Sequence, residues 1–186
     1  MKKSILPAIA IVTGSLLSLA SFGAHAADGT ITITGSVADT TCSINGMASG
    51  VQANLPVTLQ PVSASALSAA GATAGTSGPS DMQLKLTGCS GTATKAIARF
   101  ENGPTVDPTS GNLINSGTAT NVQVRLLNAQ MSPINIVTAA NNVSGTNSAT
   151  ISAGAATLSY FAQYYATGKA TAGNVNTTVQ YSMQYQ

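Results

Sequence analysis

Charged side chains and histidine are scarce in this sequence of 186 residues. Only 6% of the residues are charged, tryptophan is absent, and the single histidine is His25, near the N-terminus. Histidine-based catalytic triads, histidine-ligated metal sites and histidine pH switches would all depend on that one side chain. The length and the 44% hydrophobic content suit one domain.

The first 26 residues have the pattern of a secretory signal peptide. Two lysines precede an apolar run over residues 5–20, and Ala24-His25-Ala26 forms a small-x-small cleavage site. A membrane anchor is the alternative, but proline, glycine and serine interrupt the run and no second charged flank follows it. We expect cleavage after Ala26, so that residues 1–26 are a signal peptide and the mature chain has no histidine.

The charges that remain after this cleavage balance each other. The mature chain would carry five cations and five anions, a formal net charge of zero. A nucleic-acid partner requires a basic surface that neutralises phosphates, so nucleic-acid binding is excluded. Two cysteines and scattered carboxylates also lack the paired spacing of zinc ligands, so we expect no metal and no cofactor.

No enzyme class fits the remaining residues, and we expect no catalytic residues. A glycosidase can work with two carboxylates and no histidine, and Glu101 and Asp107 are close enough in sequence to be considered. Both lie in a turn-rich stretch, where solvated loop carboxylates are more common. An enzymatic function would require turnover of a glycoside that is lost when Glu101 is changed.

The sequence contains two cysteines, Cys42 and Cys89. In an exported protein such a pair most simply forms one disulfide, because the compartments outside the cytosol are oxidising. A redox-active pair, the alternative, would be expected close together in sequence and flanked by cations. We therefore predict a structural disulfide, which contributes about 4 kcal/mol in the chain-entropy description of such a long loop.

Alternation of apolar and polar residues dominates the mature sequence, and no helical period persists over three turns. Clusters of glycine, serine, asparagine and proline separate the alternating segments and mark turns. The fold class is therefore all-β, and many short strands with polar turns favour a β-sandwich. The candidate strands are Met82–Thr87, Ala96–Phe100, Asn121–Leu127, Thr157–Tyr165 and Thr177–Tyr185.

Two stretches are predicted to lie outside the strands. Residues 61–80 are rich in alanine, serine, threonine and glycine, and form either a long loop or a loop with a short helix near Ala64–Ala70. Residues 102–117 contain the turn signals Gly103-Pro104 and Pro108 to Gly111. Neither stretch is an interdomain linker, and the sequence shows no internal repeat.

The most informative segment follows the predicted cleavage site. In Gly29-Thr-Ile-Thr-Ile-Thr-Gly-Ser-Val37 every second residue lies on one face, which carries Ile31, Ile33, Gly35 and Val37. Burial of each large apolar side chain would contribute about 1.5 to 3 kcal/mol, whereas an exposed, uncharged strand edge would invite aggregation. The segment is either the first strand of its own sandwich or an extension that fills a groove. Gly35 favours the groove, because glycine in a strand often marks close approach by other atoms.

The C-terminal segment alternates up to the last residues. One face of the predicted strand carries Val179, Tyr181, Met183 and Tyr185, and the strand runs to Gln186. A terminal strand beside an open position leaves unpaired main-chain groups on its edge, and an added strand can satisfy them. The N-terminal segment of one molecule could therefore complete the C-terminal edge of another.

Together these motifs resemble those of chaperone-usher pilins, specifically the type 1 fimbrial major subunit family. The signal peptide is followed by the alternating segment 29–37, by Cys42 and by Leu84-Lys-Leu-Thr-Gly-Cys89. The similarity continues through Asn121-Val-Gln-Val-Arg-Leu-Leu127, Ala162-Gln-Tyr-Tyr-Ala-Thr-Gly168 and the penultimate Tyr185. Each motif is weak alone, but the resemblance covers nearly all of the mature chain.

The resemblance implies the pilin fold, an incomplete immunoglobulin-like β-sandwich that a donor strand from a neighbouring subunit completes. Residues 27–39 would be the donor-strand extension, and residues 40–186 the pilin domain. In the donor strand, Gly35 would be the small residue at a constricted pocket, and the side chains that fill the groove would be Ile31, Ile33 and Val37. The acceptor groove and chaperone-contact strand would comprise Val179, Tyr181, Met183, Tyr185 and Gln186.

The implied function is that of a structural subunit of a surface fimbria, or pilus, the filament used in cell adhesion. A periplasmic pilus chaperone would occupy the groove and hold the C-terminal carboxylate of Gln186 with basic side chains. At an outer-membrane usher, the donor strand of an identical or related pilin subunit would replace the chaperone, on an export route through the periplasm to the cell surface. The alternative is a minor or tip-proximal pilin with a carbohydrate-binding role.

Overall fold

The computed structural model describes residues 32, 39, 41–143 and 145–186. Contacts divide the chain into two units, residues 1–35 and 36–186. The described residues of the second unit form ten strands and two short 3-10 helices. In chain order these are β1 (Thr41–Ile44), η1 (Ala64–Leu67), β2 (Thr73–Ala74), β3 (Gln83–Ser90), β4 (Lys95–Phe100), β5 (Leu113–Ile114), β6 (Val122–Leu127), η2 (Gly145–Asn147), β7 (Ala149–Thr150), β8 (Ala156–Ser159), β9 (Phe161–Ala166) and β10 (Tyr181–Tyr185).

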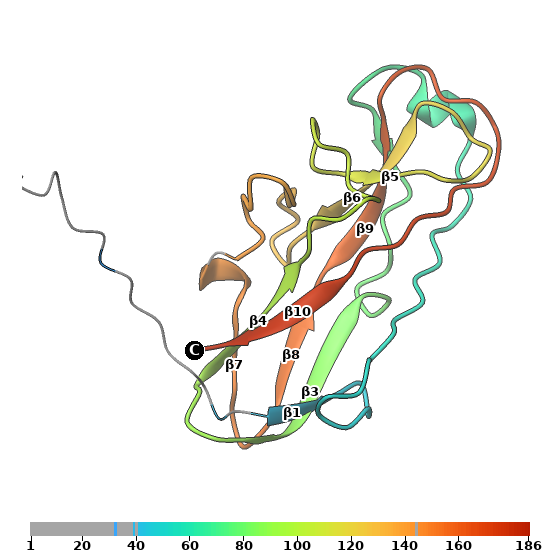
Figure 1. Ribbon diagram of the computed structural model, residues 1–186. Coiled ribbons are helices and arrows are strands. Elements are labelled where there is room, and N and C mark those ends of the chain that lie inside the picture. Colours follow the sequence, from blue (N-terminus) through green and yellow to red (C-terminus); the bar gives the residue numbers. More distant parts are fainter. Residues whose placement is uncertain (1–31, 33–38, 40, 144) are drawn as a thin grey trace, which may run out of the picture. The chain divides into compact units, whose positions relative to one another are not determined.

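The strands form three small antiparallel sheets (Figure 1). Their orders are β1-β3-β8, β10-β4-β7 and β2-β9-β6-β5. The pairing of β6 with β9 runs from Val122 opposite Ala166 to Leu127 opposite Phe161. The all-β class predicted from the alternation of the sequence is therefore confirmed. Among the residues that the structure describes, no helix is long and apolar enough to cross a membrane.

One hydrophobic core draws buried side chains from strands of all three sheets. Leu84 and Leu86 of β3 are 3% and 1% exposed, and Val124 and Leu126 of β6 are 5% and 2% exposed. These are the faces that the period-two pattern assigned to the interior, because successive side chains of a strand point to opposite sides. A smaller cluster next to η1 comprises Leu67, Ala119, Val122, Ala166 and Ala170.

The single strand predicted over residues 157–165 is two strands in the structure, β8 and β9, separated by Tyr160. β8 pairs with β3 in one sheet, whereas β9 pairs with β6 in another. The prediction was wrong here because continuous alternation shows only that a segment is extended. The sheet that each half joins depends on distant strands.

The predicted C-terminal strand is shorter than expected, since β10 begins at Tyr181 rather than near Thr177. Of the two predicted loops, the first contains the short helix η1, one of the two alternatives considered, and also β2. The second contains the two-residue strand β5, whose Leu113 pairs with Val124 of β6. Two-residue strands of this kind are too short to produce an alternating pattern.

The predicted disulfide is confirmed: Cys42 of β1 and Cys89 of β3 are bonded to each other. The two strands are antiparallel neighbours, and the ladder between them is irregular between Thr41 and Ser43, next to the bridge. The sequence separation of the cysteines is 47 residues. The bond therefore fastens the beginning of the described domain to the middle of a sheet.

Candidate functional site

A long open groove with a volume of about 1370 Å³ runs along the described part of the domain. Its first wall is the extended segment 51–59, and its second wall is residues 175–181 together with Met183. Side chains of the hydrophobic core form its floor, among them Met82, Leu84, Phe100, Leu113, Val124, Leu126 and Tyr160. Figure 1 shows segment 51–59 running as an extended chain along the domain, outside the three sheets.

The first wall has the alternating burial of a strand but is paired with no other strand. Ala53 is buried and Leu55, Val57 and Leu59 are half-buried, while the residues between them are exposed. Among the described residues, no main-chain hydrogen bond joins residues 52–62 to another segment. This wall was missed in the sequence, although its period of two was the signal that would have found it. Pro56 weakens that signal, because proline is rare in strands that are paired on both sides.

The second wall is the outer edge of β10 and of the chain that precedes it. Gln186 and Lys95 exchange both main-chain hydrogen bonds, each 2.9 Å long. Because bonded and non-bonded pairs alternate in an antiparallel ladder, Ser182 and Gln184 also direct their main-chain groups at β4. The main-chain groups of the odd-numbered residues of β10 therefore point away from β4. No described strand lies on that side, since β10 is the last strand of its sheet.

The same alternation continues upstream of β10. The carbonyl oxygens of Gln180 and Asn176 accept hydrogen bonds from the main-chain N–H groups of Glu101 and Ser116, both 2.8 Å long. The Thr105 hydroxyl donates to the carbonyl of Thr178 at 2.7 Å. The main-chain groups of the even-numbered residues are thus bonded to the chain between the end of β4 and Ser116, and those of the odd-numbered residues face the groove. Over residues 175–185 the second wall is consequently a strand edge without a strand partner, and an added strand can pair with such an edge.

The second wall also contains an unpaired polar atom. The Oγ1 atom of Thr177 is buried and has no hydrogen-bond partner within the described structure. Buried hydroxyls in folded proteins usually have a partner, and an unpaired one costs roughly 1 to 3 kcal/mol.

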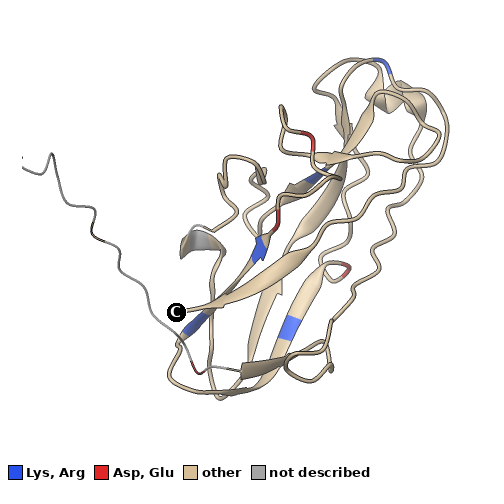
Figure 2. Cartoon of the chain, in the orientation of Figure 1, with Lys and Arg blue, Asp and Glu red and all other residues tan. Residues whose placement is uncertain are grey.

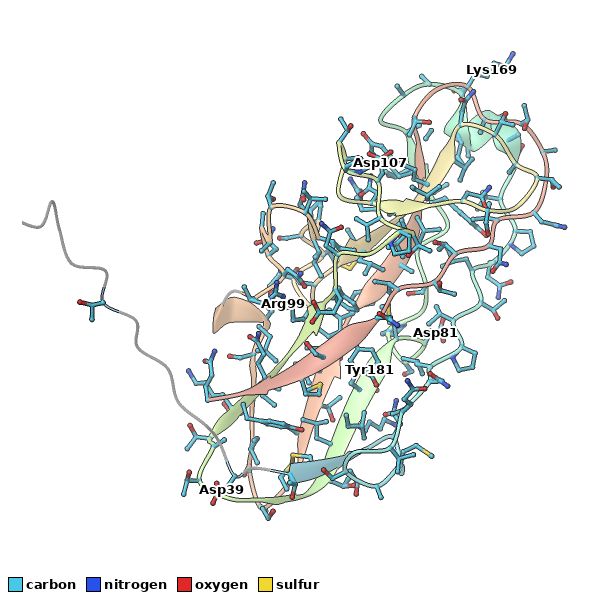
Figure 3. All side chains as sticks on the ribbon, viewed as in Figure 1. Asp39, Asp81, Arg99, Asp107, Lys169 and Tyr181 are labelled. Carbon is cyan, nitrogen blue, oxygen red and sulfur yellow. A yellow bond between two sulfur atoms is a disulfide. The ribbon has the colours of Figure 1, made fainter. Side chains whose placement is uncertain are left out.

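One side chain crosses the groove from wall to wall. The Tyr181 hydroxyl donates a 2.8 Å hydrogen bond to the carbonyl oxygen of Ala53. Tyr181 is labelled in Figure 3. Burial raises the pKa of Tyr181 above its ordinary value of 10.0, and the nearby Tyr185 raises it further. The hydroxyl therefore remains protonated, and able to donate this bond, throughout the neutral pH range.

The groove is nearly free of charge. Glu101 is the one charged residue among those that line it, and its carboxylate is occupied by Arg99, at 3.8 Å, and by the Ser182 hydroxyl. Figure 2 shows the charged residues of the described part of the chain scattered singly along it. An occupant of this groove would therefore be recognised by apolar side chains and main-chain hydrogen bonds rather than by charge.

Comparison with known proteins agrees with this geometry. The family model described as Type-1 fimbrial protein, A matches residues 59–186. The chain belongs to the type-1 fimbrial protein family. It is 39% identical to the major fimbrial subunit SMF-1 of Stenotrophomonas maltophilia, over 91% of this chain and 99% of that protein. It is 37% identical to the F17 fimbrial protein of Escherichia coli, over 96% and 98% of the two chains. Its role is that of a structural subunit of fimbriae.

The fold of this fimbrial subunit is that of solved pilus rod subunits. The P pilus rod subunit PapA superposes with a TM-score of 0.53 at 20% identity, over 78% of this chain and 99% of that one. A subunit from the structure of a chaperone-usher pilus superposes with a TM-score of 0.57 at 23% identity, over 86% and 96%. The expected immunoglobulin-like pilin fold is therefore confirmed.

The residues predicted to form the acceptor groove of the fimbrial subunit are brought together in part. Val179, Tyr181 and Met183 line the groove. Tyr185 is half-buried against the core beyond its end, and the Gln186 side chain is exposed while its main chain is bonded to Lys95. The predicted donor residues Ile31, Ile33, Gly35 and Val37, and the signal peptide, lie outside the described residues.

The two carboxylates considered for glycosidase chemistry have structural partners in this fimbrial subunit. Glu101 is engaged as described above, and Asp107 accepts hydrogen bonds from the main-chain N–H groups of Thr109 and Ser110, at 2.9 and 2.8 Å. The Ser110 bond is the largest influence that lowers the pKa of Asp107. The carboxylate of Asp107 therefore fastens a turn. No cluster of metal-binding side chains occurs among the residues that the structure describes.

Proposed function

We propose that this fimbrial subunit polymerises head-to-tail by donor-strand exchange, with residues 27–39 of one copy lying in the groove of the next. The observation that supports this most is that both walls of the groove, segment 51–59 and the edge 175–185, lack a strand partner on the side of the groove and border an apolar floor. A strand inserted between them can pair with both walls and bury its own apolar face.

The N-terminal segment has the properties that such a strand needs. It alternates over residues 29–37, contains no charge within that range, and carries three branched aliphatic residues on one face. At about 3.3 Å per residue its length matches that of the unpaired edge. Since the donor segment and the acceptor groove are different surfaces of one chain, the contact is heterologous and extends into a filament instead of closing into a ring. A neutral mature chain also allows identical subunits to stack without repulsion.

Delivery by a periplasmic chaperone to an outer-membrane usher is part of the same proposal. An empty groove leaves the half-buried apolar side chains of its walls and an unpaired strand edge open to solvent, and both favour aggregation. A chaperone that fills the groove until the donor strand arrives would prevent this. The C-terminal carboxylate of Gln186, at the end of the second wall, is the group that basic side chains of the chaperone would hold.

The test is a mature chain with a second copy of residues 28–40 appended after Gln186 through a flexible glycine-serine linker. This chain should be a monomer that forms no fibres and that unfolds at a higher temperature than the unmodified mature chain. The matched control carries aspartate at the positions of Ile31 and Ile33 in the appended copy. It keeps the length and the linker but would have to bury charge.

Equal melting temperatures of the two fusions, or fibres formed by the intact one, would contradict the proposal. Size-exclusion chromatography, electron microscopy and thermal unfolding followed by circular dichroism supply the three measurements.

A further inference from the structure

We propose that Asn102-Gly103 is a site of spontaneous deamidation beside the groove, and that the fold protects the other Asn-Gly pair of the chain, Asn45-Gly46. The sequence contains these two Asn-Gly pairs. Glycine after asparagine favours deamidation, because it has no side chain to hinder attack by its own main-chain nitrogen. In a folded protein the rate then depends on how easily the asparagine can turn towards that nitrogen.

The reaction requires no reagent other than water. The main-chain nitrogen of Gly103, after losing its proton to hydroxide, attacks the side-chain carbonyl carbon of Asn102. A carbon–nitrogen bond forms, the bond to the side-chain nitrogen breaks, and ammonia leaves with a proton taken back from water. Water then opens the resulting succinimide at either carbonyl and produces aspartate or isoaspartate. The net change consumes water, releases ammonium and leaves a carboxylate at residue 102.

Nothing in the described structure holds Asn102 in place. It lies beyond β4, which ends at Phe100, and it is exposed. Neither its main chain nor its side chain is hydrogen-bonded to another described residue, and the N–H group of Gly103 has no described partner either. A Cβ atom placed on Gly103 would meet no atom within 4 Å. Asn102 can therefore turn towards the nitrogen of Gly103 without breaking a hydrogen bond.

Asn45 is also exposed, but hydrogen bonds hold it against β3. Its N–H donates to the carbonyl of Lys85 at 2.8 Å, and its Oδ1 atom accepts from the N–H of Lys85 at 2.8 Å. Its Nδ2 atom donates to the carbonyl of Gln83 at 3.2 Å. Asn45 and Gly46 have φ angles of 49° and 82°, typical of the tight turn that this pair favours. Attack by Gly46 would require these side-chain bonds to break, so hydrogen bonding rather than exposure distinguishes the two pairs.

The position of Asn102 gives its deamidation a structural consequence. The preceding residue, Glu101, lines the groove, and its N–H group donates to the carbonyl of Gln180 in the second wall at 2.8 Å. Deamidation places a second carboxylate next to that of Glu101. Isoaspartate also lengthens the main chain by a methylene group directly after Glu101. The modified chain should therefore hold its second wall less firmly.

The test is incubation of the folded mature chain in a mildly alkaline buffer, followed by proteolysis and mass spectrometry of the peptides that contain the two pairs. Asn102 should deamidate at least about tenfold faster than Asn45, because the hydrogen bonds of Asn45 add to its barrier. In concentrated urea, where these bonds are lost, the two pairs should react at similar rates. The fusion with the appended donor copy adds no asparagine, and it serves as the folded sample should the mature chain aggregate.

Gly103→Ala is the matched variant. The position can accept alanine, because its φ angle is not in the left-handed region and the added Cβ atom has open space. The variant should deamidate at Asn102 at least about tenfold more slowly than the parent, since the new methyl group hinders the attack, and equally fast at Asn45. After the same incubation, the melting temperature of the parent should fall and that of the variant should not.

Equal rates at the two pairs in the folded chain, or a faster reaction at Asn45, would overturn the proposed site. Deamidation of Asn102 in Gly103→Ala at the parental rate would also overturn it. Complete deamidation of the parent without a fall in its melting temperature would overturn the consequence for the second wall. None of these measurements depends on donor-strand exchange.

Discussion

The side-chain amide of Asn142 is hydrogen-bonded to both main-chain polar groups of Phe100. The Phe100 N–H donates to Oδ1 at 2.9 Å, and Nδ2 donates to the Phe100 carbonyl at 2.8 Å. The Tyr160 hydroxyl contacts Ala98 in the same way, at 3.3 Å to its N–H and 3.2 Å to its carbonyl. Two buried side chains therefore replace a strand along the edge of β4 that faces away from β10.

This replacement explains where the domain is incomplete. The short strand β7 pairs with only the first two residues of β4, and Asn142 and Tyr160 satisfy the main chain beyond it. The sheet that contains β4 and β10 thus has one closed edge. Its other edge, the outer side of β10, is open to the groove, so an added strand has a single place to pair in this sheet.

Replacement of Asn142 tests its role as a substitute strand. Asn142→Leu keeps the branched shape and the number of heavy atoms but leaves the buried N–H and carbonyl of Phe100 without partners, and is expected to destabilise the domain by about 2 to 4 kcal/mol. Urea denaturation of the fusion with the appended donor copy measures this change. Asn102→Leu, at an exposed position, is the matched control and should change stability by less than about 0.5 kcal/mol. Similar effects of the two substitutions would refute the role.

We expect Tyr160 to make the stability of the folded protein depend on pH in the alkaline range. Burial raises the pKa of Tyr160 from 10.0 to about 12, and the bond to Ala98 opposes this only in part. The folded protein therefore retains a proton that the unfolded chain releases, so stability is full below about pH 10 and falls as the pH rises towards 12. The loss attributable to Tyr160 is roughly 2 to 3 kcal/mol.

Tyr160→Phe isolates this contribution. It keeps the ring, which packs edge-on against Phe100 with centroids 5.0 Å apart, but it removes the ionisable hydroxyl and the bonds to Ala98. We expect lower stability than the parent at pH 8, by about 1 to 3 kcal/mol, and a smaller difference at pH 12. Urea denaturation at several pH values measures both. A difference between parent and variant that stays constant with pH would show that Tyr160 does not cause the dependence.

We expect a substitution at Thr177 to stabilise the protein. Its buried hydroxyl has no partner in the described structure, and valine has nearly the same shape. Thr177→Val should therefore raise the stability of the unmodified mature chain by about 1 kcal/mol, as measured by thermal unfolding. Thr178→Val, at the adjacent exposed position, controls for the change of residue type. A destabilised Thr177→Val variant would reveal a hydrogen bond of this hydroxyl in solution.

The disulfide predicts a large loss of stability on removal. The bond between Cys42 and Cys89 closes a loop of 47 residues, and its removal by substitution of both cysteines with alanine should cost about 4 kcal/mol in the chain-entropy description. The measurement is urea denaturation of the fusion with and without the substitutions. Addition of a reductant should destabilise the parent and leave the double variant unchanged; sensitivity of both would point to another cause.

The sequence predicted those features that depend on neighbours along the chain. Alternation located β3, β4 and β6 to within a few residues, because a strand with one buried face imposes a period of two. The same reasoning did not separate β8 from β9, since both halves are extended and only their distant partners differ. Segment 51–59 was missed for a related reason: it has the alternation of a strand but contains Pro56 and has no partner to pair with.

Some features of the groove were likewise predictable from the sequence, and others were not. The spacing of the residues alone shows that Val179, Tyr181 and Met183 form one apolar face. The disulfide was likewise predictable, because an exported chain with two cysteines most simply bonds them to each other. Two other contacts could not be predicted from neighbouring residues. Asn142 closes one edge of β4, and Tyr181 crosses the groove to Ala53. The partners are 42 and 128 residues apart, respectively. The alternation within a short stretch of residues determines which side chains are buried. The partner of each buried polar group, and therefore the position of the open edge, is decided only when segments that are distant in sequence pack against one another.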